Sequence, residues 1–96
     1  MADQIDTLGV GEALFDIVKG NIDARLRDLG VTPYTVSRAT GHYPAWLTDA
    51  LRKSSRISLQ RVAEIADALG VEPGELCDEG TIWDTVPPPS WWRGGE

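Results

Sequence analysis

Apolar residues recur at helical spacing near the start of the chain. Between Gly11 and Gly30 they lie three or four residues apart, at Leu14, Val18, Ile22, Leu26 and Leu29, which is the pattern of a helix with one buried face. Helices often carry a glycine just past their last turn, as Gly30 would here. Gly20 and Asn21 interrupt the pattern, and we expect a break or kink there, with Asn21 capping the second part. A continuous helix with an interior glycine is the alternative, at a cost of about 1 kcal/mol.

Capping residues predict two more short helices in the middle of the chain. Thr32 followed by Pro33 is a helix cap with proline in the first helical position, and Gly41 ends this helix. Pro44 starts the next helix, because proline is tolerated in the first turn of a helix and not further inside. We expect this helix to run to about residue 53.

The segment 58–76 predicts the last two helices. Ser58 caps a helix that ends at Gly70, and residues 72–76 add one further helical turn. One face of the longer helix is an apolar stripe, formed by Leu59, Val62, Ile65, Ala66 and Leu69. No segment of strand length alternates between apolar and polar residues. We therefore predict an all-α fold of five short helices.

The end of the chain has a different composition. Residues 87–89 are three consecutive prolines, which favour an extended spacer, and Trp83, Trp91 and Trp92 all lie in the last fourteen residues. In one interpretation Trp83 folds back on the helical core while residues 87–96 stay mobile. In the other, the three tryptophans anchor a protein partner or a second copy of the chain. The sequence leaves both open.

Composition and single residues exclude several classes of function. Apolar residues make up 42% of the chain and charged residues 25%, which is typical of a globular protein. No apolar run reaches the roughly 18 residues of a membrane helix, and the first fifteen residues lack the basic leader of a secretory signal, so we expect a cytoplasmic protein. With one cysteine, Cys77, and one histidine, His42, we expect no disulfide and no metal site. No acid–base pair or phosphate-binding glycine loop is recognisable, so we expect no enzymatic activity and no cofactor.

Charge is segregated along the chain, although the net charge is −6. Residues 1–18 hold four acids and no base, residues 19–61 hold eight bases against three acids, and the remainder holds eight acids against one base. A polyanion responds to the local potential within a Debye length of about 8–10 Å. The basic middle of the chain is therefore able to attract a nucleic acid if the acidic ends face elsewhere.

A helix ending at Gly41, a short turn and a helix starting at Pro44 form a candidate helix-turn-helix motif. Residues 21–77 resemble the Cro and lambda-repressor-like helix-turn-helix family without a gap. The matching positions of the motif are the cap, the apolar and small residues between the helices, the turn glycine and a buried aliphatic: Thr32, Val36, Ser37, Gly41 and Leu47. The segment SLQRVAEIADALGVEPGEL, residues 58–76, resembles the fourth and fifth helices of the family most closely. We divide the chain into an acidic N-terminal helical extension (1–20), a helix-turn-helix domain (21–79) and a Pro/Trp-rich tail (80–96).

The resemblance implies a DNA-binding regulator similar to repressors, Cro proteins and antitoxins, acting on double-stranded DNA as a homodimer. The recognition helix would be about 44–53, lying in the major groove. The implied candidates for base contact are Tyr43, Pro44, Ala45, Trp46, Thr48 and Asp49. Arg52, Lys53 and Arg56 would neutralise phosphates, and Thr32 and Tyr34 would hold the phosphate at the start of the preceding helix.

Several positions differ from the family pattern. Leu26 and Leu51 stand where many members pair an arginine with a glutamate, and apolar replacement of both partners of a buried ion pair is compatible with the fold. Thr40 and Ala50 are smaller or more polar than the usual aliphatic residues. Trp46, turned inward, would fill the space beside them.

A second hypothesis belongs to a different class. The residues at the start of the recognition helix offer few hydrogen-bonding groups, so the same fold is compatible with a non-DNA-binding adaptor or inhibitor that engages a protein. This hypothesis predicts that Trp46 and the tail tryptophans form one exposed apolar patch.

Overall fold

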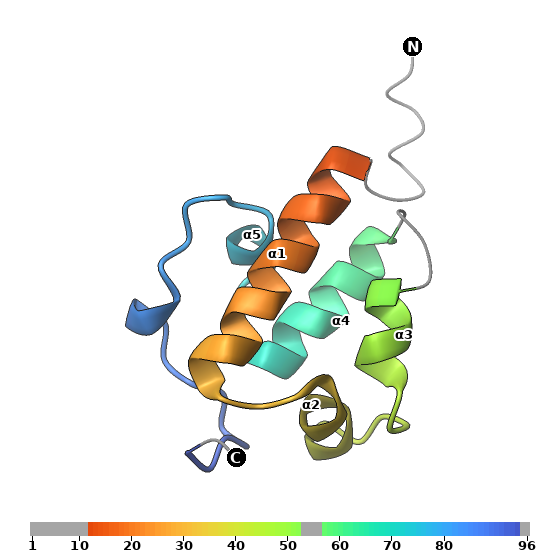
Figure 1. Ribbon diagram of the computed structural model, residues 1–96, viewed down its shortest axis with the longest axis vertical. Helices are drawn as coiled ribbons and strands as arrows, with labels where there is room; N and C mark the ends of the chain where they lie inside the picture. The colour runs from red at the N-terminus through yellow and green to blue at the C-terminus, as the bar shows by residue number, and fades with distance from the viewer. Residues whose placement is uncertain (1–11, 53–56, 95–96) are drawn as a thin grey trace.

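The structure, a computed structural model, describes residues 12–52 and 57–94, and all of its regular elements are helical (Figure 1). They are the α-helices α1 (Glu12–Leu29), α2 (Pro33–Ala39), α3 (Trp46–Arg52), α4 (Leu59–Leu69) and α5 (Pro73–Leu76), and the 3₁₀ turn η2 (Trp83–Thr85). No described residue belongs to a strand. The predicted all-α fold of five helices is confirmed.

The helices α2 and α4 begin at the predicted caps, Thr32 and Ser58. The Thr32 hydroxyl accepts the Thr35 amide at 3.2 Å, and the Ser58 hydroxyl accepts the Arg61 amide at 3.0 Å, so each satisfies an amide that has no partner within its helix. Gly70 follows α4 in the left-handed conformation with φ +73°. Figure 1 shows α1 crossing the centre of the view, with α2 below it and α3 to the right of α4 in this view.

The predicted break at Gly20 is wrong, because α1 runs without interruption from Glu12 to Leu29. Asn21 does not cap a second helix. Its buried amide donates to the backbone carbonyls of Leu76 at 2.6 Å and Asp78 at 2.9 Å, at the end of α5. Because Val18 and Ile22 on either side are fully buried, packing of the same helix face continues through the glycine and holds the two halves of α1 in line.

The hydrophobic core lies between α1, α4 and the helix-turn-helix pair, and contains the residues of the predicted stripes. Leu26 and Leu51 are both buried in it. Leu59 is an exception among the predicted stripe residues, since it is exposed. Cys77 is only half-buried, and burial raises the pKa of its thiol.

Arg25 is the largest fully buried side chain. Its guanidinium donates to the Leu69 carbonyl at the end of α4 and to the carbonyls of Val86 and Pro87 in the C-terminal segment, at distances between 2.7 and 3.3 Å. The last carbonyls of a helix lack partners within it and attract cations. Burial lowers the pKa of Arg25, while the carboxylates of Asp28 and Glu75 act in the opposite direction. Arg25 therefore belongs to the core and adds nothing to a basic surface.

The C-terminal segment returns to the helices and packs against them. Trp83 is buried and lies against the Arg25 guanidinium, 5.7 Å from the ring centroid. The indole N–H groups of Trp91 and Trp92 donate to the carbonyls of Ala68 at 2.7 Å and Leu29 at 2.8 Å. Pro89 lies so close to Gly70 that a Cβ there would approach it to 2.9 Å. Trp83 folds back as one of the two interpretations expected, and Pro89, Trp91 and Trp92 also pack against the helices, which that interpretation did not expect. Residues 95 and 96 of the stretch 87–96 lie outside the described residues.

Candidate nucleic-acid interface

Ser37 joins the two helices of the helix-turn-helix motif. It is fully buried, and its hydroxyl donates to the Pro33 carbonyl at 2.9 Å and accepts the Leu47 amide at 3.1 Å. That amide lies in the first turn of α3 and would otherwise have no partner. A small residue was expected here to let the helices approach. The structure adds that its hydroxyl fixes how α3 leaves the turn.

The turn between α2 and α3 depends on Gly41. Its φ of +81° lies in the left-handed region, where a side chain is unfavourable. The amide of His42 then donates to the Ser37 carbonyl at 2.9 Å, which directs the chain back toward the core. Val36 before the turn and Leu47 after it are both fully buried. The sequence-based assignment of the helix-turn-helix is confirmed in its helices, turn and core positions.

The helix predicted to be the recognition helix begins two residues later than expected. Pro44 and Ala45 form a turn in which the Trp46 amide donates to the Tyr43 carbonyl at 2.9 Å, and α3 starts at Trp46. The first four-residue helical bond runs from the Asp49 amide to the Ala45 carbonyl at 2.8 Å. Pro44 therefore precedes the helix instead of opening it. The expected end near residue 53 lies outside the described residues.

The expectation that Trp46 faces the solvent is wrong. Only 5% of its surface is exposed, and it belongs to the hydrophobic core. The His42 ring stacks on it with the centroids 3.6 Å apart and the planes nearly parallel, and the Arg61 guanidinium lies 6.0 Å from the Trp46 ring centroid. The inward position was the alternative, and the small neighbour Ala50 leaves room for it. His42 was expected to form a local hydrogen bond in the turn, and in the structure its side chain makes this ring contact.

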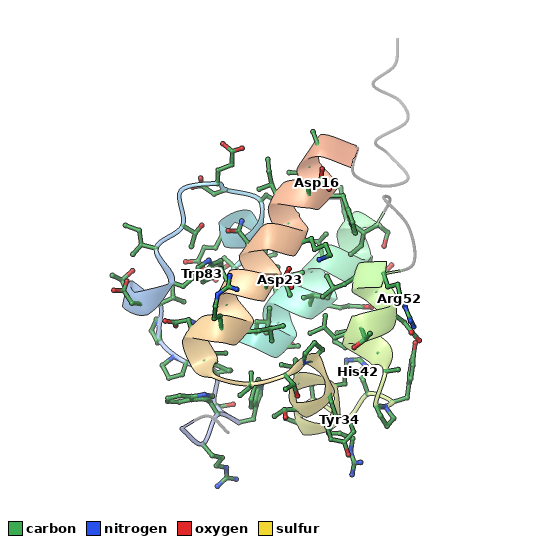
Figure 2. The ribbon with its side chains drawn as sticks, viewed as in Figure 1. Asp16, Asp23, Tyr34, His42, Arg52 and Trp83 are labelled. Carbon is green, nitrogen blue, oxygen red and sulfur yellow. The ribbon has the colours of Figure 1, made fainter. Side chains whose placement is uncertain are left out.

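The remaining candidates form an exposed edge on α3 and the turn before it. Tyr43, Pro44, Ala45 and Thr48 are exposed, and Arg52 points outward on the far side of α3 (Figure 2). Asp49 lies between them. One of its carboxylate oxygens accepts the Tyr43 hydroxyl at 3.1 Å and the other accepts Arg52 at 3.0 Å. The hydrogen bond to Asp49 raises the pKa of Tyr43. This edge therefore presents hydroxyl and guanidinium donors around a carboxylate that is already neutralised.

The candidates for phosphate contact are divided between α2 and the end of α3. Thr32 and Tyr34 are exposed at the start of α2, and Figure 2 shows Tyr34 pointing away from the core. The sequence reasoning did not name Arg38 as a site residue, although it lies one turn after Tyr34. Its guanidinium donates to the Tyr34 hydroxyl at 3.2 Å, an interaction that the four-residue spacing would have indicated. Lys53 and Arg56 lie outside the described residues.

A family model for the Cro/C1-type helix-turn-helix DNA-binding domain matches residues 21–78. The chain belongs to this family. The matched range contains the end of α1 and all of α2 to α5, and leaves out the C-terminal segment with η2. Searches among curated proteins and among solved structures gave no match.

The adaptor hypothesis made a prediction about this Cro/C1-type domain that the structure contradicts. It required Trp46 and the tail tryptophans to share one exposed patch. Trp46 and Trp83 are buried, and the half-buried Trp91 and Trp92 direct their N–H groups to backbone carbonyls. These side chains are occupied by intramolecular packing.

Among the described residues, no helix is long and apolar enough to cross a membrane.

Proposed function

We propose that this Cro/C1-type domain is a sequence-specific transcriptional regulator of the repressor, Cro or antitoxin kind. The observation that carries the proposal is the division of α3 into two faces. Trp46, Leu47, Ala50 and Leu51 anchor the helix in the core, while the opposite edge stays open. A helix held in this way presents its first turn rigidly to a groove, which is what base discrimination requires.

The open edge offers a specific set of base contacts. The methyl group of Ala45 fits against a thymine methyl, and the Thr48 hydroxyl either donates to or accepts from a base edge. The Tyr43 hydroxyl is held by Asp49 at 3.1 Å, so it reaches the groove in a fixed orientation. Pro44 contributes shape rather than hydrogen bonds. We infer that readout combines apolar contact at Ala45 with one or two hydroxyl groups.

Affinity comes from contacts to phosphates on both sides of the groove. Arg52 at the end of α3 is 72% exposed in its side chain, and Lys53 and Arg56 follow it in the sequence. Thr32 and Tyr34 lie at the start of α2, whose amide end faces a phosphate in this arrangement. We infer a homodimer that binds two half-sites about 10 base pairs apart, centre to centre. The two-fold symmetry of the dimer would then be matched by a two-fold symmetric sequence in the bound DNA.

Selection of bound duplexes from a random library, at two salt concentrations, tests the proposal. We expect a consensus with two-fold symmetry, and binding that weakens as salt increases because phosphate contacts release counterions. Ala substitution of both Arg52 and Lys53 is expected to lower the slope of log K against log salt by about 0.9 per lost contact. Absence of enrichment at both salt concentrations would contradict the proposal.

A further inference from the structure

The strongest unassigned feature is a pocket between α2 and the C-terminal tail. It has a volume of about 470 Å³ and is lined by Val31, Tyr34, Thr35, Arg38, Ala39, Trp91 and Arg93. Two segments more than fifty residues apart in the chain meet there. Figure 1 shows the end of the described chain returning to the level of α2, at the bottom of the view. The pocket therefore exists only because the tail packs against the helices.

The pocket is cationic in an acidic protein. Among the residues that the structure describes, Arg38 and Arg93 bring two guanidinium groups to its lining, and none brings a carboxylate. The contrast is a second pocket near the end of α4, which is lined by Asp67, Glu72 and Glu75 and by no basic residue. With a net charge of −6, a concave site with two positive groups and no acid favours an anion over any cation or neutral ligand.

The two arginines also differ from most of the other basic residues. Four of the described basic side chains already form ion pairs within the molecule: Lys19, Arg25, Arg52 and Arg61. Among the residues that the structure describes, Arg27, Arg38 and Arg93 form no such pair, and the last two share this pocket. A guanidinium without a carboxylate partner keeps its charge available for an external anion.

The tail holds Arg93 in place. Trp91 and Trp92, directly before it, are fixed by indole hydrogen bonds to Ala68 and Leu29. Leu29 is the last residue of α1, and the loop that follows it leads through Val31 to Thr32, the cap of α2. The pocket thus borders the residues already proposed to face a DNA phosphate, and the exposed side chain of Tyr34 belongs to both.

We propose that this pocket binds a backbone phosphate of duplex DNA, with Arg93 of the tail and Arg38 of α2 as its ligands. The inference rests on the proposed function and extends the DNA interface beyond the helix-turn-helix domain. A duplex that meets the start of α2 continues along its backbone past the tail, so the phosphate adjoining the Thr32 and Tyr34 contact enters the pocket. The tail then contributes affinity without reading bases.

Salt titrations with a random-sequence duplex of 20–30 base pairs test this assignment in the full chain. We expect Arg93→Ala to lower the slope of log K against log salt by about 0.9 and to weaken binding about three- to tenfold at 0.1 M salt. Arg93→Lys should restore the slope, because the slope counts charges. Arg27→Ala is the matched control, since it removes an exposed, unpaired arginine that does not line the pocket, and it should keep the wild-type slope.

The outcomes separate this inference from the proposed function. If the wild type binds duplex with a normal salt slope and Arg93→Ala retains that slope, the pocket is not part of the interface and the inference is wrong, while the proposed function stands. If Arg27→Ala lowered the salt slope as much as Arg93→Ala, net charge alone would explain the effect. That result would also overturn the inference. If the wild type shows no salt-sensitive duplex binding, both proposals fail.

Inorganic phosphate provides a second probe for small anions. The nitrogen-bound proton of the Trp91 indole, followed by NMR, reports on the pocket directly. In one outcome, millimolar phosphate shifts this signal in the wild type but not in Arg93→Ala, while the salt slope for duplex binding is the same in both. That result would assign the pocket to a small anion and overturn the DNA contact. A shift together with the loss of slope supports a phosphate site used by DNA.

Discussion

Asn21 and Arg25 stabilise the fold through hydrogen bonds that no local pattern reveals. Both lie on α1, where polar residues usually face water, yet both are buried and donate to carbonyls 44 to 62 residues further along the chain. Those carbonyls belong to the ends of helices or to the tail, where no helical partner is available. Each of these buried donors on α1 is thus paired with carbonyl oxygens that have no partner within a helix. No described buried side-chain nitrogen or oxygen is left without a partner.

Replacing Arg25 should be costly although Met fills a similar volume. Arg25→Met leaves the buried Leu69 carbonyl without its donor, at about 1–3 kcal/mol, and also removes the donor of the part-buried carbonyls of Val86 and Pro87. We expect the free energy of unfolding to fall by about 2–5 kcal/mol, measured by urea denaturation followed by circular dichroism. Arg27→Met, two residues away and exposed, should change it by less than about 0.5 kcal/mol. Similar values for both variants would contradict the structural role assigned to Arg25.

Two glycines should respond in opposite ways to the same substitution. Gly20 is exposed in the interior of α1, and a Cβ there would meet no atom within 4 Å. Gly20→Ala is therefore expected to stabilise the protein by about 0.5–1 kcal/mol. Gly70→Ala should destabilise it by more than 1 kcal/mol, because the backbone there is left-handed and the new Cβ would lie 2.9 Å from Pro89. Thermal and urea denaturation of the two variants check both signs.

At the scale of elements, the helix-turn-helix illustrates what a sequence predicts well. Caps such as Thr32 and Ser58 and the turn glycine Gly41 act within three or four residues, so their positions were predictable. The sequence left two orientations open for Trp46, because it did not reveal that the His42 ring stacks on it from the preceding turn. The start of α3 also differs from the prediction, because proline is compatible both with the first turn of a helix and with the turn before it.

Thr48 and Trp46 should separate specificity from stability within α3. Thr48→Ala removes an exposed hydroxyl, so we expect no change in unfolding but a loss of about 1–3 kcal/mol in discrimination at one base position. Trp46→Ala removes a buried aromatic ring and should lower the free energy of unfolding by about 3–5 kcal/mol. Denaturation and competition binding with single-base operator variants measure the two effects. A large stability loss in Thr48→Ala would contradict the exposed position of that residue.

At the scale of the whole molecule, the C-terminal segment is as much a part of the fold as α5. It supplies two indole donors, the carbonyls that accept Arg25, and a proline seated on Gly70. The sequence left open whether its tryptophans fold back or face a partner, because tryptophan suits both a buried site and an interface. Trp91 and Trp92 fold back because their indole N–H groups find the carbonyls of Ala68 and Leu29, which have no partner within their own helices. The positions of these carbonyls are known only from the three-dimensional arrangement of the helix ends.

Shortening the chain should expose how much the tail contributes. A chain that ends at Val86 lacks both indole donors and the Pro87 carbonyl, and we expect it to lose about 2–4 kcal/mol of unfolding free energy together with part of its urea m-value. Trp92→Phe, which removes one donor and keeps most of the ring, should cost about 1 kcal/mol. If the shortened chain had the same free energy of unfolding as the full chain, the tail would be dispensable for stability.

The place where the tail rests is built from the last carbonyls of two different helices, α1 and α4. Neither carbonyl is in position until both helices have formed and met, so the tail has nothing to dock on before then. The tail is therefore held by the arrangement of two helices and not by either helix alone.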